Sequence, residues 1–203
     1  MLKYVKLLFL NYKRINLPVG NKMNKAFFIL LLFCCFFAAC TKTSVGSLAA
    51  QNAQAAIDLK IITDYLAQNP SLKATPVDSA GFNTGVYYII KQQGSGTALF
   101  TNSTQITVAD TGRLLYDGKS YTDQLFTQTN DFHPSYILSQ VIRGWQLGIP
   151  QCKKGGIIRL LIPSRYAYGP NPQPNLGNAL GLTNGLPANA VLDFDIQLYD
   201  IVN

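Results

Sequence analysis

The side chains that usually carry covalent or metal chemistry are few in this sequence and poorly grouped. His133 is the only histidine, and the sequence supplies no partners with which it would form a catalytic triad or a zinc site. Asp193 and Asp195 resemble a pair of carboxylates, but strand alternation predicts a solvated face for both, opposite Phe194. The run 153–156 lacks the glycine spacing and the following Ser or Thr of a phosphate-binding loop, so we interpret it as a turn.

Apolar surface is better represented, in the stretch VIRGWQLGIPQCKKGG from Val141 to Gly156. It contains Trp145, the only tryptophan, directly after a glycine. An indole ring brings a large flat apolar surface with a single N–H group. Trp145 alone indicates a core residue, and only its neighbours can indicate that it also forms the floor of a pocket.

The elements that must position these residues are mostly strands. Residues 49–68 carry an apolar stripe at helical spacing, with Ile57, Ile61 and Tyr65, and Asn69-Pro70 ends this helix. Residues 85–96 read as a strand that ends in a Gly-Ser-Gly turn, and residues 156–163 read as a buried strand. A short helical stretch is expected over residues 136–150, cut by Pro150.

Alternation defines two further strands. Residues 191–201 place Leu192, Phe194, Ile196 and Leu198 inward, and Ile106, Val108 and Asp110 share one face of another strand. Asp117-Gly118 predicts a hairpin turn after it. Strands outnumber helices, so the sequence predicts an α+β fold with a mostly antiparallel sheet packed on one short helix.

The positive charge of the chain lies mainly at its start. The chain has 17 basic and 10 acidic residues, and six of the basic residues with no acidic one lie in residues 1–39. The remainder is nearly neutral, with its Lys and Arg scattered. A nucleic-acid-binding domain needs a basic patch, so we expect no nucleic-acid partner.

Residues 23–40, MNKAFFILLLFCCFFAAC, have the features of an export signal. A basic residue precedes an apolar run that is shorter than the about 20 residues of a membrane span. The end of the run resembles a bacterial lipobox, which implies cleavage before Cys40 and a lipid on its thiol; an uncleaved signal anchor is the alternative. Cys152 is then the only cysteine outside the signal and Cys40, which leaves no internal disulfide.

Three blocks together give a specific resemblance: VIRGWQLGIPQCKKGG, RLLIPSRYAYG and LPANAVLDFDIQLYDI, in this order. They resemble the FKBP-type peptidyl-prolyl isomerases over roughly residues 104–202, and the front of the chain resembles the lipoprotein members of Gram-negative bacteria. The resemblance implies a five-stranded antiparallel sheet wrapped around one short helix, preceded by an N-terminal helix. It divides the chain into a signal region 1–40, a tether and helix 41–84, and an isomerase domain 85–203.

The resemblance also implies roles for individual residues at a shallow apolar pocket that holds a prolyl ring. Trp145 matches the pocket floor, the Ile142 backbone N–H matches the donor to a substrate carbonyl, and the Tyr168 hydroxyl matches a substrate contact. Phe194 matches an apolar wall that shapes the catalytic pocket. Rotation about an X–Pro bond requires no nucleophile, metal or cofactor, so none is expected.

The remaining pocket positions form the substrate-binding surroundings in the resemblance. Val141 precedes the donor at the helix start, Leu186 and Phe132 match further walls, and Tyr121 matches a family phenylalanine. Macrolides are a second class of ligand that the resemblance suggests, beside proline-containing polypeptides that are unfolded or folding.

Two departures weaken the match at the pocket. The family usually has a tyrosine at Asp110 and an aspartate at Thr122. Asp110 either faces inward and supplies the pocket acid from the opposite strand, or marks the end of its strand at an Asp-Thr-Gly turn. The long loop 169–187 is either a substrate lip or an ordinary insertion.

Two functions follow as hypotheses. The first is a prolyl isomerase that assists folding in the cell envelope, anchored by Cys40 in a Gram-negative membrane, expected to be the outer one, with its domain facing the periplasm. The second is a catalytically weak chaperone or binding module of the same fold, which the departures at Asp110 and Thr122 favour.

Overall fold

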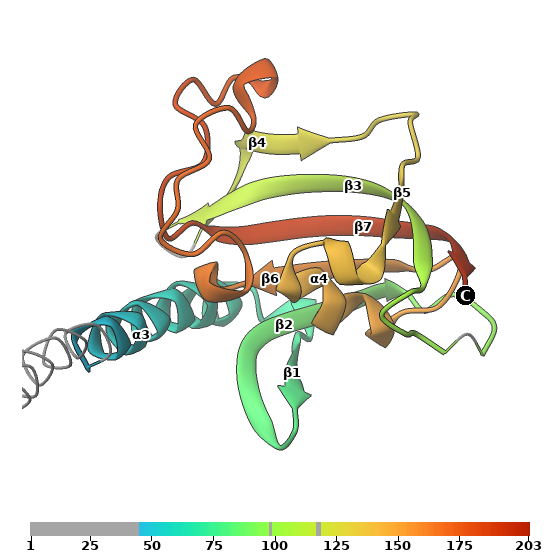
Figure 1. Ribbon diagram of the computed structural model, residues 1–203, viewed down its shortest axis with the longest axis horizontal. Helices are drawn as coiled ribbons and strands as arrows, with labels where there is room; N and C mark the ends of the chain where they lie inside the picture. Colours follow the sequence, from blue (N-terminus) through green and yellow to red (C-terminus); the bar gives the residue numbers. More distant parts are fainter. Residues whose placement is uncertain (1–44, 98, 117–118) are drawn as a thin grey trace, which may run out of the picture. The chain divides into compact units, whose positions relative to one another are not determined.

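An antiparallel sheet forms the body of the fold (Figure 1). The computed structural model describes residues 45–97, 99–116 and 119–203, without the side chains of 45–46 and 119–123. The strands in these residues are β1 (Thr75–Ser79), β2 (Phe82–Gln92), β3 (Gln105–Tyr116), β4 (Lys119–Gln128), β5 (Ser135–Ile137), β6 (Ile157–Ile162) and β7 (Val191–Val202). Their order is β1-β2-β6-β7-β3-β4, and β5 also pairs with β3. The α+β class is confirmed, but the expected count of five strands is wrong, because the described residues alone form a seven-stranded sheet.

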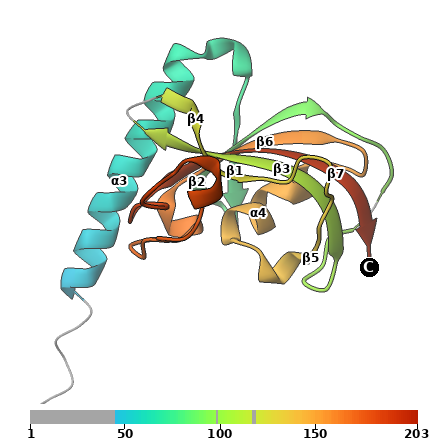
Figure 2. The same ribbon diagram turned by 90° about the horizontal axis from the view of Figure 1, so that it is seen from above.

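In the described part of the chain, two α-helices accompany the sheet, namely α3 (Val45–Gln68) and α4 (Arg143–Gly148), and Figure 2 shows α4 lying against one side of it. Short 3-10 turns occur at Pro70–Leu72, Leu138–Gln140, Ile149–Gln151, Ser164–Tyr166 and Asn178–Leu180. The helical stretch expected over residues 136–150 is wrong at its start, because Ser135–Ile137 pairs with β3 as a strand. Pro150 stands in the first turn of a 3-10 helix that continues α4, a position where its missing N–H is tolerated.

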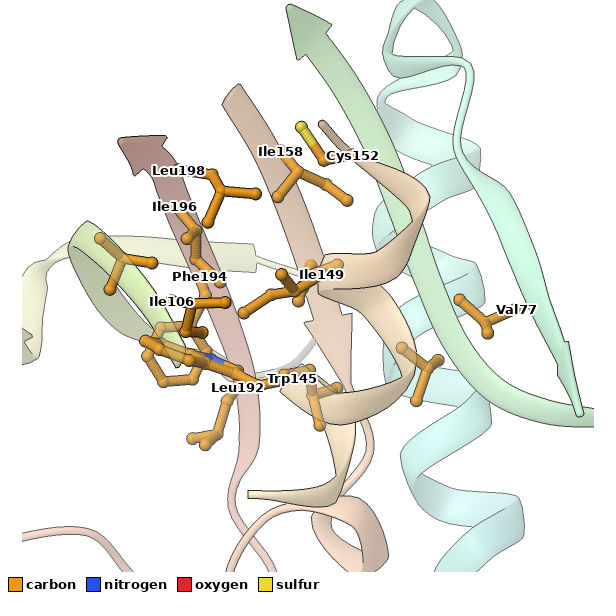
Figure 3. Packing of buried hydrophobic residues seen from close by; sticks show 14 of the residues in the cluster. Val77, Ile106, Trp145, Ile149, Cys152, Ile158, Leu192, Phe194, Ile196 and Leu198 are labelled. Atoms are coloured by element: carbon orange, nitrogen blue, oxygen red, sulfur yellow. The ribbon is translucent and has the colours of Figure 1, made fainter. Parts of the chain in front are cut away.

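The inner face of the sheet carries the main core. The expected inward residues of β7 are buried, from Leu192 at 0% exposed to Phe194 at 3%. Trp145 and Ile149 project from α4 and the turn after it toward these strands, as Figure 3 shows. Cys152 lies in the same cluster as a buried free thiol, and it packs there as a small apolar side chain.

Two glycines on one face of α4 let the helix approach the sheet closely. A Cβ on Gly144 would lie 2.4 Å from the Ile162 side chain, and one on Gly148 would lie 2.5 Å from Leu160. Any larger residue would push α4 away from β6 and lift Trp145 with it. The glycine before Trp145 is therefore the residue that allows the indole to reach the sheet.

The outer face of the sheet is covered by α3. Ile62 and Tyr65 are buried in a second cluster with Ile89, Leu161 and Val191 of three different strands. Burying an aliphatic side chain such as Ile62 contributes about 1.5–3 kcal/mol. The predicted apolar stripe is shifted, since Ile57 is exposed while Asp58 is fully buried.

This cover overturns the expectation of a solvated face for Asp193. The side chain is fully buried because α3 lies over this end of β7, and Arg159 of β6 binds it through Nε at 2.7 Å and Nη2 at 2.6 Å. Arg159 also donates to the Tyr65 hydroxyl at 2.7 Å. Asp195, farther along β7, is half-buried and pairs with Lys91 and Arg113.

The sheet also extends beyond the domain boundary expected from the sequence. β1 and the first residues of β2 lie before residue 85, within the segment assigned to the tether and helix. The described part of α3, Val45–Gln68, already includes residues before the expected start at residue 49. The backbone described from Gly46 to Asn203 forms one compact unit.

Candidate active site

A cavity of about 340 Å³ opens on the inner face of the sheet beside α4. Its lining is mainly apolar and aromatic, and comes from four strands, α4 and its entry, and the long loop after β6: Asp110, Phe126, Thr127, Tyr136, Gln140, Val141, Ile142, Trp145, Tyr168, Leu176 and Phe194. Ligand pockets are typically clefts of this size, lined by apolar side chains with a few placed polar groups.

Edge-to-face aromatic contacts build the floor. Trp145 is 5% exposed, and its ring lies 5.1 Å from that of Phe194 at an angle of 82°. Phe194 contacts Phe126 in the same way at 5.2 Å and 89°. Tyr136 meets Trp145 at 6.1 Å and 78°. Such T-shaped pairs add about 0.5–1.5 kcal/mol each beyond area burial, so the floor is rigid.

A glycine in β3 allows this packing. A Cβ on Gly112 would lie 2.6 Å from Phe126 and 2.8 Å from Phe194. The register between β3 and β4 shifts beside it, so Phe126 lies at a bulge. The bulge turns the Phe126 ring inward over Gly112, where it closes one side of the cavity.

Two donors at the cavity, one backbone N–H and one indole N–H, have no acceptor among the described residues. Ile142 is the N-cap residue of α4. The first N–H groups of a helix have no acceptor within the helix, and the Ile142 N–H also donates to no other acceptor among the described residues. The Trp145 Nε1–H is buried, again without a partner in the described part of the chain. A bound ligand can supply the missing acceptors.

Tyr168 reaches the cavity from a segment that α3 holds. Asp58 Oδ2 accepts hydrogen bonds from the Ser164 N–H at 2.8 Å and from the Ser164 Oγ at 2.6 Å. Ser164 opens the 3-10 turn, and its carbonyl accepts from Gly169 N–H at 2.8 Å. Burial raises the pKa of Tyr168, and the nearby charges of Asp110 and Tyr136 raise it further. The Tyr168 side chain therefore stays a neutral O–H donor.

Asp110 faces inward, so the alternative that its strand ends there is wrong. β3 continues through it to Tyr116, so no turn begins there. Asp110 is 5% exposed, and its Oδ2 accepts a hydrogen bond from Thr127 Oγ1 at 3.2 Å. Burial raises the pKa of the carboxyl group, and the Thr127 hydrogen bond offsets part of that rise.

The structure brings together most of the residues that the sequence singled out. Six of them line the cavity: Asp110, Val141, Ile142, Trp145, Tyr168 and Phe194. The Tyr121 side chain and Cys40 lie outside the described residues. His133 stacks on Tyr199 of β7, with ring centroids 3.9 Å apart, and does not line the cavity.

Two expected walls are not in the cavity. Phe132 is 72% exposed, because the chain there crosses from β4 to β5 outside the sheet pairing. Leu186 is fully buried in the main core, where its backbone pairs with Gln173 at the base of the long loop. Tyr136 and Leu176 instead line the cavity.

Sequence reasoning missed Phe126, Thr127, Tyr136, Gln140 and Leu176. Tyr136 could have been found, because its position five residues before Val141 fits a strand that precedes the helix. Leu176 could not, because only the folded loop 169–187 places it there. Gly177, next to it, packs on the Phe126 backbone in a left-handed conformation with φ of 86°.

The described residues hold no group of three or more His, Cys, Asp or Glu side chains that could bind a metal ion. No helix in the described ranges is long and apolar enough to cross a membrane.

Known proteins resemble this chain in sequence and in fold. Residues 96–199 match the family described as FKBP-type peptidyl-prolyl cis-trans isomerase. The chain is 37% identical over 121 residues to the FKBP-type peptidyl-prolyl cis-trans isomerase FkpA of Buchnera aphidicola subsp. Schizaphis graminum, which is 60% of this chain and 42% of the relative. It is 32% identical over 108 residues to FK506-binding protein 1 of Saccharomyces cerevisiae, 53% of this chain and 85% of that one.

A solved structure of a peptidyl-prolyl cis-trans isomerase from Pseudomonas syringae pv. tomato has the same fold. Its TM-score is 0.53 at 23% identity, and the match covers 72% of this chain and 95% of the other. The chain spans only 38% to 44% of the length of the FkpA relatives that it matches. The family match covers more than half of the sequence and the cavity lies within it, so the chain belongs to the FKBP-type peptidyl-prolyl cis-trans isomerases.

Proposed function

We propose that the protein catalyses cis-trans isomerisation of X–Pro peptide bonds in unfolded or folding polypeptides. The observation that carries this proposal is the open apolar cavity of about 340 Å³ with Trp145 and Phe194 at its floor. The family membership of the chain supports the same activity.

The cavity suits the chemistry of this rotation. Turning about an X–Pro bond breaks amide resonance, with a barrier of about 18–20 kcal/mol for a peptide bond. The twisted amide has lost the charge separation of the planar form. An aromatic, water-poor site therefore binds the twisted state better than the planar ground state, which lowers the barrier.

Two donors would hold the substrate on either side of the bond. The Ile142 N–H, left without an acceptor at the start of α4, would bind a carbonyl next to the proline. The Tyr168 hydroxyl would bind a second carbonyl from the loop side. Both groups act by positioning, and neither forms a bond with the substrate.

The sharpest test removes one hydroxyl from the site. We expect Tyr168→Phe to lower kcat/KM by about 2- to 12-fold, equivalent to about 0.5–1.5 kcal/mol for one hydrogen bond. Turnover would be measured on a short X–Pro peptide and on a protein whose refolding is limited by proline isomerisation. Tyr199→Phe is the matched control, because Tyr199 stacks on His133 away from the cavity.

Two results would contradict this proposal in different ways. If the wild-type chain accelerates neither reaction but suppresses aggregation of an unfolded client, the binding-module hypothesis replaces the enzyme. If both reactions are accelerated and Tyr168→Phe behaves like Tyr199→Phe, the isomerase remains and the assignment of Tyr168 fails.

We also propose that the chain is a lipoprotein of a Gram-negative envelope, anchored through Cys40 with its folded domain in the periplasm. The lipobox-like end of the apolar run before Cys40 supports this anchor. We propose that this anchor lies in the outer membrane. The name of the yeast relative, FK506-binding protein 1, supports macrolides as a further class of ligand.

The anchor has a direct test. We expect Cys40→Ser to abolish incorporation of a labelled fatty acid in a Gram-negative host and to release the protein from the membrane fraction. Cys152→Ser serves as the control, because Cys152 is a buried residue of the folded domain. Unchanged labelling of Cys40→Ser would contradict the anchor without affecting the proposed isomerase.

A further inference from the structure

Asp110 places a carboxylate in the cavity, and no cation among the described side chains balances it. It is the only acidic residue among those that line the cavity, and none of them is Lys, Arg or His. No ion pair formed by the described residues includes Asp110. A buried carboxylate without a partner is costly for a folded protein.

The groups around Asp110 do not neutralise it. Thr127 of β4 donates one hydrogen bond to Oδ2, while Oδ1 accepts from no donor in the described part of the chain. Tyr136 of β5 and Tyr168 contact the same cavity, and the charge of Asp110 adds to the burial that raises the pKa of each. Lys91 and Arg113, across the sheet, are bound to Asp195.

The Asp110 carboxylate therefore lacks a positively charged hydrogen-bond donor inside the cavity. The proline nitrogen carries no hydrogen, and the carbonyls next to it are acceptors. Neither can donate to Asp110, and the backbone N–H groups of neighbouring residues carry no charge, so a charged partner must come from a side chain beside the proline. A Lys ammonium or an Arg guanidinium supplies both the charge and the hydrogen-bond donors.

We infer that Asp110 is a specificity residue that selects X–Pro sites flanked by Lys or Arg. This inference rests on the proposed function, because it names the substrate class of the same cavity. The position of Asp110 beside the floor, 95% buried but lining an open cavity, supports a contact with the residue next to the bound ring.

The test compares matched peptides with the full chain. Peptides carrying Lys, Leu or Glu directly before the proline, and a second set with these residues directly after it, would be assayed for kcat/KM. Their affinities would be measured separately from the fluorescence of Trp145, the only tryptophan, which lies in the cavity. The binding measurement does not depend on turnover.

In the flanking position that faces Asp110, we expect the wild type to favour Lys over Leu by about tenfold and to disfavour Glu, as a charge-assisted hydrogen bond would. Asp110→Asn keeps the shape of the side chain and should bring the Lys and Leu values together. Asp200→Asn removes the same charge from an exposed site paired with Lys154 and should keep the preference.

Acidification gives a second readout. The preference for Lys should disappear toward low pH at a higher pH than an exposed aspartate would require, because burial favours the protonated form of Asp110. Equal Lys, Leu and Glu affinities in the wild type, or the same preference in Asp110→Asn, would overturn the inference. Peptide binding with the expected preference but without any turnover would instead overturn only the proposed isomerase activity.

Discussion

Two buried carboxylates lie on neighbouring strands of this sheet and face opposite sides of it. Asp193 of β7 is fully buried under α3, and Arg159 binds both of its oxygens at 2.6 and 2.7 Å. Asp110 of β3 is 5% exposed, and its carboxyl group accepts one hydrogen bond from the described residues, from Thr127 at 3.2 Å. Their similar burial but different pairing distinguishes a structural carboxylate from one that is available to a ligand.

Pairing with Asp193 changes the pKa of Arg159. Burial by itself lowers the pKa of Arg159, but the hydrogen bonds and charge of Asp193 raise it well above its usual range. Arg159 therefore stays positively charged throughout the neutral and alkaline pH range. The outer face of the sheet uses its charges to hold α3, while the inner face leaves one charge uncompensated at the cavity.

The largest effect is expected from breaking the pair. Asp193→Asn removes the charge that compensates Arg159 while keeping the shape of the side chain, and should lower the free energy of unfolding by about 3–5 kcal/mol. Urea denaturation at neutral pH, followed by circular dichroism, measures this loss.

Asp195→Asn is the control on the same strand and face. Asp195 is paired with Lys91 and Arg113 but its side chain is 25% exposed, so its loss should cost about 1 kcal/mol or less. Equal losses from the two substitutions would mean that burial of the Asp193 pair adds nothing to its contribution.

A smaller effect of opposite sign is expected on the inner face. Burial raises the pKa of Asp110 above its unfolded value, so the wild type loses stability as pH rises through the folded pKa. Asp110→Asn removes this loss, and should be more stable than the wild type at neutral pH by on the order of 1 kcal/mol, since the Thr127 partner can still donate.

The pH profile separates this explanation from a change in packing. Below the unfolded pKa, both Asp110 and its Asn replacement are neutral, so the two proteins should have the same free energy of unfolding there. Thermal or urea unfolding between pH 3 and pH 8 measures the difference. A gain that is constant with pH, or a loss at neutral pH, would count against an uncompensated charge at Asp110.

The comparison also explains how far the sequence predicts this molecule. Alternation along β7 places Phe194 and its inward neighbours correctly, because it depends only on the two-residue period of a strand. The same rule fails for Asp193, because the cover of the outer face comes from α3, more than a hundred residues earlier in the sequence.

The site is predictable to a similar depth. The residues near the start of α4 and the tyrosine after the 3-10 turn lie within short motifs, and the structure brings Ile142, Trp145 and Tyr168 to one cavity. The match of Phe132 to a wall depends on its spacing from Val141, and the residues between them include the irregular chain between β4 and β5, where spacing does not fix the direction of a side chain. Leu176 depends on the tertiary path of the long loop.

The position of β7 in the sheet has a consequence for how fast the protein folds. β7 is the last of the described strands in sequence, yet it lies between β6 and β3, and its pairing joins Gln105 to Val202. Closing such long loops is entropically unfavourable, and topologies dominated by distant pairings fold slowly. During synthesis, β3 and β6 leave the ribosome before β7, so their apolar faces stay exposed until β7 pairs with them. A protein proposed to speed the folding of others is thus itself exposed to aggregation until β7 has been made and has paired with both neighbours.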